Sequence, residues 1–494
     1  MQFYTKRANE AVKVTFAPDG KIPDNPWSDL DCALSYNKLD FSERWLLLTG
    51  EERKLINKLY KKCSILDDDK KISISQGIIS GAFPIFSLRK IGPQKYLNEK
   101  HPDLGEITLE DSLMLNLVSG EDVKRYQSPK TNLCIIFPYQ KKERMNLLEG
   151  GEFKKNYPSV WTYLKKFEKD LRKRDGEKLD NEHWYAYSRN QNLDKQSSPK
   201  LLIAGTAPEL RVSIDADGAV AANDKRVYTI SDKSIEGLLF LQGILNSPVC
   251  NFVFKRIARP KVNGFFDIEK QFIAPLPIPK ATGKNRDAVA KHAKSLQELH
   301  TKRRDILSKL ERRMEAVRFK TRPETFLFPG LKETKDHVDE APKNLEDSER
   351  KSWAKQKYEE DLQGRYDEIT ARIHPSANLD ADFTDAELSF SIDGIRVLES
   401  IFLNGDEGAF VLAQWKVLAQ TFSITDKTEG KKLCNALRKL AVTENAALVK
   451  QIIELEGELT ALEAKIAKEE HDVNQLIFDL YGLSEQEISL IETR

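Results

Sequence analysis

PKLLIA at residues 199–204 begins a series of short apolar runs, each of which has the length of a β-strand. RVSI at 211–214 and RVYTI at 226–230 follow it, and the turn sequence DADG lies at 215–218. Runs that are rich in β-branched and aromatic residues and bounded by Gly- and Asp-rich turns are typical of strands. The sequence therefore predicts a β-sheet that includes these three runs.

The same pattern extends over a larger region. LCIIF at 133–137 is a further strand candidate, whereas helical spacing interrupts the strands near 158–174 and 234–256. The run PLPIP at 275–279 closes the region, because three prolines in five residues continue neither a helix nor a central strand. We therefore predict an α+β domain with a mixed, irregular β-sheet over residues 71–280.

Other segments flank this domain. Residues 1–70 are expected to be irregular with some helix, and residues 285–320 to form a long basic helix. Residues 321–442 are predicted to combine a charged linker with a small helical bundle. The expected core of that bundle consists of Leu398, Ile401, Phe402, Phe410, Leu412, Trp415 and Leu418.

The clearest periodic pattern lies in the last segment, residues 443–494. Apolar side chains recur there at spacings of four and three, namely at Leu448, Ile452, Leu455, Leu459, Leu462, Ile466, Val473, Leu476 and Leu480. This is the heptad pattern of a coiled coil, and such a helix needs an apolar partner. The helix at 285–320 is one candidate, which would give an antiparallel, coiled-coil-like spacer within the chain. A homodimer through the C-terminal helices is the other.

Charge is distributed unevenly along the chain. The net charge is +1, but residues 121–280 contain 28 Lys and Arg against 20 Asp and Glu. Residues 281–320 contain 12 against 5, and residues 321–494 contain 21 against 35. A basic middle and an acidic end favour a polyanion-binding surface followed by a region that faces solvent or a partner protein.

The sequence shows no feature of export or membrane insertion. No apolar stretch approaches the roughly 20 residues that span a bilayer, and the N-terminus lacks the apolar core of a signal peptide. The five cysteines are far apart in the sequence, which favours free thiols in a reducing compartment. We therefore expect no membrane association and a location in a prokaryotic cytoplasm.

Motifs of a catalytic centre are missing from the sequence. A methyltransferase that acts on a base amino group needs a glycine-rich cofactor loop and an Asn/Asp-Pro-Pro-aromatic turn. The nearest match to that turn, Asn25-Pro26-Trp27, lacks the second proline. Glu152-Phe153-Lys154 and Glu463-Ala464-Lys465 match the Glu-x-Lys part of a nuclease motif, but without the strands that should precede it. The seven histidines show no spacing typical of metal ligands. We therefore predict a binding protein with no catalytic residue, cofactor or metal of its own.

Nine short elements between residues 70 and 280 occur in the order that is typical of one family. They are QGIISG at 76–81 through Phe86, LVSGEDVKRY at 117–126, IIFPY at 135–139, Tyr157-Pro158 with Tyr163-Leu164, Leu171 with Arg174, Trp184-Tyr185 with Arg189, PKLLI at 199–203, GILNSP at 243–248 and PLPIP at 275–279. In this order the region resembles the C-terminal specificity domain of TaqI-type and single-chain type II adenine methyltransferases. IFDLYGLS at 477–484 is similar to the ending of these enzymes. In most relatives a methyltransferase domain precedes this region, and this sequence does not contain it. Either the system is split, with catalysis on a partner subunit, or this chain is the C-terminal piece of a longer enzyme. One recognition domain with two long helices also resembles half of a type I specificity subunit.

The resemblance implies a role in a restriction–modification or related phage-defence system. The chain would then be a specificity subunit that binds double-stranded DNA. It would direct a partner that binds S-adenosylmethionine and methylates adenine N6, with or without a nuclease. Gly77, Gly81, Gly120, Pro158, Asn246 and Ser247 are expected to serve the fold.

Aromatic residues and cations alternate in the basic region, as in KRY at 124–126, WTYLKK at 161–166, WYAYSR at 184–189 and FVFKR at 252–256. Cations neutralise phosphates, and arginine also binds base edges. The candidate DNA-binding residues are Lys124, Arg125, Arg189, Lys255, Arg256, Arg259 and Lys261. A coiled-coil scaffold or DNA mimic in a defence or anti-defence complex is the alternative function. An enzyme with a degenerate centre is a third possibility.

Overall fold

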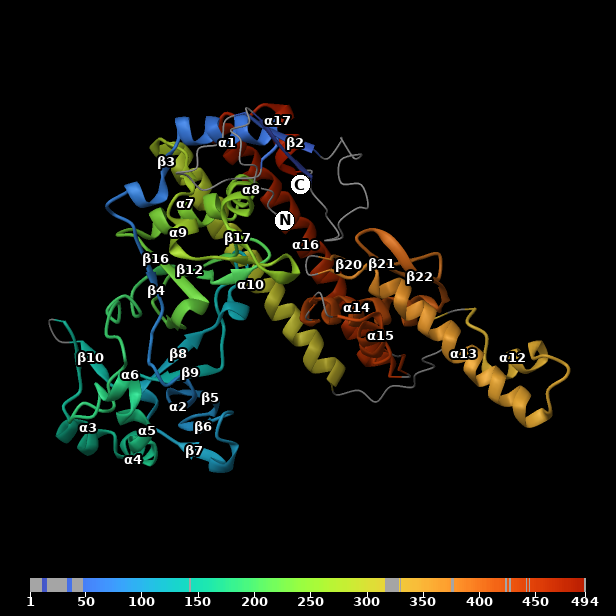
Figure 1. Cartoon of the computed structure of the whole chain (residues 1–494), viewed down its shortest axis with the longest axis horizontal. Helices are drawn as coiled ribbons and strands as arrows, with labels where there is room; N and C mark the ends of the chain where they lie inside the picture. Colours follow the sequence, from blue (N-terminus) through green and yellow to red (C-terminus); the bar gives the residue numbers. More distant parts are fainter. Residues whose placement is uncertain are drawn as a thin grey trace. The chain divides into compact units, whose positions relative to one another are not determined.

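The computed structural model describes residues 11–15, 33–37, 48–141, 144–315, 328, 330–374, 377–422, 424–425, 428–440, 442–443 and 445–492. The chain divides into two compact units (Figure 1). The first unit contains residues 1–260, 266–297 and 469–494. The second contains residues 261–265 and 298–468. Asn25-Pro26-Trp27 lies outside the described residues.

The larger sheet of the first unit has six strands and is mixed. Its order is β15 (Val220–Ala222), β8 (Met114–Val118), β9 (Leu133–Ile136), β5 (Ser87–Gly92), β6 (Lys95–Leu97) and β7 (Glu106–Thr108). β15 pairs with β8 in parallel, and the other neighbours are antiparallel. The predicted strand at 133–137 is therefore inside this sheet, next to β5 and β8.

The three runs from which the sheet was predicted form most of a second, antiparallel sheet. Its order is β14 (Val212–Asp215), β12 (Lys200–Ala204), β16 (Val227–Ser231) and β4 (Ser73–Gln76). Every residue of β12 is buried, in keeping with its apolar sequence. The turn at 215–218 leads from β14 to β15 and so connects the two sheets, with Gly218 at a φ of +66°. An added Cβ at Gly218 would lie 2.6 Å from the Ser197 carbonyl carbon, so only glycine fits there.

Smaller elements complete the first unit. Its remaining strand pairs are β1 (Ala11–Thr15) with β2 (Ala33–Asn37), β10 (Tyr139–Lys141) with β11 (Met145–Leu147), β3 (Ser64–Ile65) with β19 (Pro277–Ile278), and β18 (Phe266–Asp267) with both β13 (Thr206–Ala207) and β17 (Arg259–Pro260). Its helices are α1 (Gly50–Lys62), α2 (Phe83–Phe86), α3 (Gly150–Asn156), α4 (Pro158–Lys166), α5 (Glu168–Arg172), α6 (Arg174–Glu177), α7 (Ile235–Leu245), α8 (Pro248–Ile257), α9 (Lys270–Ile273) and α17 (Glu485–Glu492).

Several contacts in the first unit join segments that are far apart in the sequence. β3 pairs with β19, which brings the residues after α1 to the proline-rich run. At the end of the long helix α16 (Ala446–Tyr481), the Tyr481 hydroxyl donates to the Pro277 carbonyl at 2.7 Å. Lys58 on α1 donates to the Gly482 carbonyl at 2.8 Å. The C-terminal LYGL sequence therefore packs on the sheet-containing unit, which extends beyond the predicted span of 71–280.

The second unit contains a sheet that the sequence analysis did not predict. Its elements are α12 (Thr334–Glu340), α13 (Asp347–Thr370), β20 (Leu379–Thr384), β21 (Glu387–Ile392), β22 (Ile395–Phe402), α14 (Gly405–Thr421) and α15 (Gly430–Leu437). The prediction of an all-helical bundle is therefore wrong for residues 386–402, which form two antiparallel strands. The signal for them was Asp393-Gly394, because both residues have positive φ, as a tight hairpin turn requires. Leu398 and Ile401 are buried on β22, but Phe402 is 70% exposed and lies outside the core.

Within the second unit, α10 (Gly283–Glu315) lies beside α16. Arg303 bonds to Glu463 at 3.0 Å, and Arg313, further along α10, bonds to Gln451, which is earlier in α16. The two helices are therefore antiparallel there. Leu310 shares an apolar cluster with Ile452 and Leu459 of the heptad series, and with Phe410 of α14. These contacts favour the partner within the chain over the homodimer.

The described helices include no single one that is both long enough and apolar enough to cross a membrane. α7 and α8 pass such a test only as a pair, and they are bent by 67° relative to each other.

Candidate nucleic-acid interface

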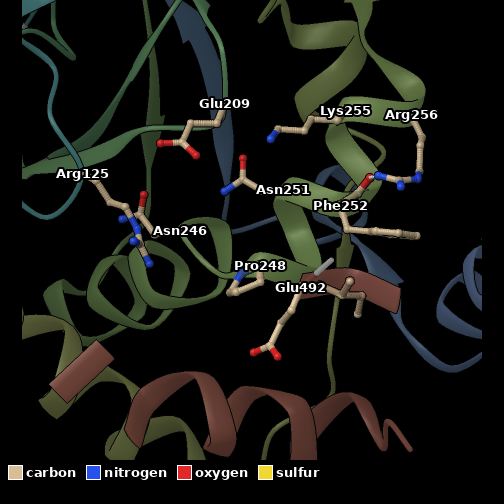
Figure 2. Close-up of a pocket in the computed structure, with 10 residues that line it drawn as sticks. Arg125, Glu209, Asn246, Pro248, Asn251, Phe252, Lys255, Arg256 and Glu492 are labelled. Atoms are coloured by element: carbon tan, nitrogen blue, oxygen red, sulfur yellow. Dashed lines mark hydrogen bonds between the residues drawn. The ribbon is translucent and has the colours of Figure 1, made fainter. Parts of the chain in front are cut away.

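An open cavity of about 480 Å³ lies at the start of α8 (Figure 2). It is lined by Arg125, Glu209, Asn246, Pro248, Asn251, Phe252, Lys255, Arg256, Ile491 and Glu492. Three of the seven predicted DNA-binding residues, Arg125, Lys255 and Arg256, therefore meet around one cavity. Lys124, Arg189, Arg259 and Lys261 do not line it.

Two asparagines that line the cavity are fixed by hydrogen bonds to the backbone. The Asn246 side chain accepts from the Val212 amide and donates to the Val212 carbonyl, both at 2.9 Å, and so joins the end of α7 to β14. Asn251 accepts from the Leu210 amide at 2.7 Å. Ser247 caps α8 by accepting from the Cys250 amide. Asn246 and Ser247 thus serve the fold, as predicted, and Asn251 is a lining residue that the sequence analysis missed.

Two of the three cavity cations already have partners inside the first unit. Arg125 lies 3.1 Å from Glu470, and its guanidinium is 5.3 Å from the centre of the Tyr126 ring. Arg256 lies 2.8 Å from Glu52, which is 7% exposed in its side chain. The charge of a cation that already forms an ion pair with a carboxylate of the protein is partly neutralised, so this cation attracts a phosphate less strongly. These two residues are therefore weaker candidates than Lys255.

Lys255 is half-buried on α8, and Figure 2 shows its side chain extending toward the Glu209 side of the cavity. The Arg256 guanidinium instead lies over the Phe252 ring, 3.5 Å from its centre. Lys124 is exposed, and desolvation together with the neighbouring Arg211 lowers the pKa of its ammonium group. Arg189 is 55% exposed in its side chain and lies 3.4 Å from Asp175. Lys255, Lys124 and Arg189 keep a cationic group at the surface of the first unit.

Arg259 and Lys261 belong to β17 and to the loop that follows it. Both are exposed. The Lys261 amide donates to the Phe265 carbonyl at 2.7 Å and closes the loop, in which Val262 is 79% exposed.

The remaining expected fold residues include Gly77, where an added Cβ would lie 2.2 Å from the Ala222 carbonyl oxygen. That glycine permits close packing of two backbones.

Replacement of Arg256 or Lys255 by alanine is expected to have different consequences. Arg256→Ala leaves the buried Glu52 carboxylate without its guanidinium and should lower the free energy of unfolding by about 2 kcal/mol. Lys255→Ala removes a half-buried side chain with no such partner role and should change stability by less than about 0.5 kcal/mol. Chemical denaturation of both variants measures the difference. Equal stability of the two variants would contradict a structural role for Arg256.

The described residues contain no group of three or more His, Cys, Asp or Glu side chains placed to hold a metal ion. Glu152 lies on α3, which the short strand β11 precedes, so the expectation that no strand comes before this Glu-x-Lys sequence is wrong. Glu463 lies within the long helix α16, and neither Glu-x-Lys sequence is itself on a strand. Among the described cysteines, Cys63, Cys134, Cys250 and Cys434 are free.

Comparison with known proteins supports the resemblance found in the sequence. Residues 115–278, from β8 to β19, match the family described as the TaqI-like C-terminal specificity domain. The predicted resemblance is thus confirmed for about a third of the chain. No curated protein matches the sequence. A crystal structure of the type IIG restriction endonuclease BpuSI is similar at 11% identity with a TM-score of 0.31, over 50% of this chain and 28% of that enzyme. The chain thus spans little more than a quarter of that enzyme's length.

Proposed function

We propose that this chain recognises a DNA sequence for a restriction–modification or related phage-defence system. The observation that supports the proposal most directly is the match of residues 115–278 to a specificity domain. The charge of the first unit is consistent with this proposal, because surface cations, including Lys124, Arg189 and Lys255, lie on that unit. In such a domain, cations bind phosphates and polar side chains recognise base edges.

In this proposal the chain supplies recognition and a partner supplies catalysis. The partner binds S-adenosylmethionine, methylates adenine N6, and carries or recruits a nuclease in systems that cleave DNA. The acidic second unit, with its long paired helices, is the surface that we propose for docking this partner. The complex would act on genomic and invading DNA in a prokaryotic cytoplasm.

The decisive experiment is sequencing of modified bases in genomic DNA from cells that express the candidate partner methyltransferase, with and without this chain. We expect methylated adenines at one sequence motif only when the chain is present. An unchanged methylation pattern would contradict the proposed recognition role and favour the scaffold or DNA-mimic alternative. Methyl transfer or DNA cleavage by the purified chain alone would instead show that it is an enzyme.

A further inference from the structure

The helical segment at residues 154–178 of the first unit is strongly basic. It contains nine Lys and Arg against four Asp and Glu. It contains the end of α3 and all of α4, α5 and α6. This segment contributes none of the seven candidate DNA-binding residues and does not line the cavity at α8.

The two faces of α4 and α5 differ in character. Val160, Leu164, Phe167 and Leu171 are buried in the main apolar core at spacings of four, three and four. Lys166, Lys169 and Lys173 are exposed, also at spacings of three and four, and are offset by two residues from the buried series. Since positions two residues apart lie on different sides of a helix, the three lysines form a stripe on the solvent face. We call Lys166, Lys169 and Lys173 the lysine stripe.

Two of the four carboxylates of this segment form ion pairs with cations outside the stripe. Glu168 bonds to both Lys165 and Arg172, and Asp175 lies 3.4 Å from Arg189. Asp170 lies within the stripe and reduces its charge balance to +2. Within the described residues, no carboxylate lies within ion-pair distance of the three stripe ammonium groups. The stripe is therefore a surface with a charge balance of +2 whose three ammonium groups form no ion pair among the described residues.

Two contacts hold the stripe on a fixed support. Glu110 accepts from the Ser159 and Val160 amides at 2.8 and 2.9 Å, which satisfies the start of α4. The Tyr163 hydroxyl donates to the Ile85 carbonyl at 2.8 Å and attaches α4 to the residues that precede β5. A row of charges on a fixed element loses less conformational entropy on binding than charges on a free loop.

We infer that the lysine stripe binds the phosphates of one strand of the target DNA, outside the bases that are recognised. This inference rests on the proposed function. Lys166 ends α4 and Lys173 directly follows α5, with Phe167 departing from helical dihedral angles between the two helices. The seven-residue separation of the first and last lysine corresponds to a rise of about 10 Å at helical spacing. One DNA strand presents a phosphate about every 3.4 Å along the axis, so the stripe has the length of about three phosphate spacings. Contacts of this kind add affinity and position the protein without selecting a sequence.

The test compares DNA binding by the full chain with that of a Lys166→Ala/Lys169→Ala/Lys173→Ala variant. Affinity is measured over a range of salt concentrations, on the target duplex and on a duplex with a scrambled target. We expect the variant to bind both duplexes roughly 10- to 100-fold more weakly at about 0.1 M salt. The slope of log affinity against log salt should become shallower by about 2 to 3, because each released counter-ion contributes about 0.9.

A matched control removes the same charge elsewhere in the first unit. Lys54, Lys61 and Lys70 are exposed and have no ion pair among the described residues, so Lys54→Ala/Lys61→Ala/Lys70→Ala tests the effect of net charge alone. A Lys166→Arg/Lys169→Arg/Lys173→Arg variant should retain both affinity and slope. If the stripe and control variants lose affinity equally, or if neither loses any, the stripe inference is wrong. If the unaltered chain does not bind DNA with the partner present, the proposed function itself fails.

Discussion

Arg174→Met should lower the free energy of unfolding of the first unit by about 4 kcal/mol, one of the two largest losses that we expect. The Arg174 guanidinium is buried and donates to four backbone carbonyls, those of Leu171, Ser80, Trp184 and Ala186, at 2.6–2.8 Å. Methionine fills a similar volume but leaves these four acceptors without a donor. Each buried unsatisfied group costs about 1–3 kcal/mol, with partial relaxation reducing the sum.

Arg174 therefore joins α5 to the segments at 80 and 184–186, which are 94 and 10 residues away in sequence. Burial lowers the pKa of the Arg174 guanidinium, but arginine stays charged at any pH at which the protein is folded. Arg174→Lys should retain only part of the stability, because an ammonium group cannot reach four carbonyls arranged around a planar fork.

Denaturation by guanidinium chloride measures both variants. The neighbouring Arg172→Met is a matched control, since Arg172 is 32% exposed in its side chain and bonds to the surface carboxylates Glu168 and Asp180. We expect a much smaller loss for that control, because solvent screens its ion pairs. An Arg174→Met variant as stable as the Arg172→Met variant would show that the four carbonyls find water or other donors.

Lys200→Met is expected to cost about 3–5 kcal/mol of stability. Lys200 is fully buried on β12, where its ammonium lies 2.6 Å from the Asp215 carboxylate and also donates to the carbonyls of Gln196 and Ser198. Asp215 in turn accepts from the Ala219 and Val220 amides in the turn between the sheets. Removal of one partner of a buried ion pair leaves an uncompensated charge, which explains the size of the expected loss.

The double variant Lys200→Met/Asp215→Asn distinguishes this explanation from a simple packing defect. Asparagine retains an oxygen for the turn amides but carries no charge, so the double variant should be more stable than Lys200→Met alone. A double-mutant cycle from denaturation curves gives the coupling energy, expected at about 2 kcal/mol or more. Additive losses would contradict an electrostatic role for the pair. DNA binding of the double variant should stay close to that of the unaltered chain.

Both residues belong to elements that carried the family resemblance, Leu171 with Arg174 and PKLLI at 199–203. Their side chains are buried and bond within the fold, so these polar residues in the family pattern are structural rather than DNA-binding. Two arginines of the clusters that combine basic and aromatic residues likewise bond within the fold. Arg125 and Arg256, chosen as DNA contacts, bond to Glu470 and Glu52. Lys255, which lies next to Arg256 in the sequence, remains a candidate.

Local sequence patterns were sufficient to predict the α+β class, the strands at 200–204, 212–215 and 227–231, and the apolar seam of the last helix. Each of these is a local pattern, because the alternation or spacing of apolar residues reports which side of one element is buried. The same local patterns located the region that matches the specificity domain. Even the missed strand β22 had a local signal, the Asp393-Gly394 turn.

The pairing of distant elements, by contrast, depends on the folded chain. Glu52 and Arg256 are 204 residues apart, as are Pro277 and Tyr481, and no local pattern links either pair. A charged residue has the same sequence signature whether it lies at the surface or holds a buried carboxylate. The role of such a residue depends on the distant group that lies beside it in the folded chain. For this reason the resemblance to a specificity domain could be predicted from the sequence. The sequence could not separate the cations that bond to carboxylates within the fold from those that remain candidates for DNA contact.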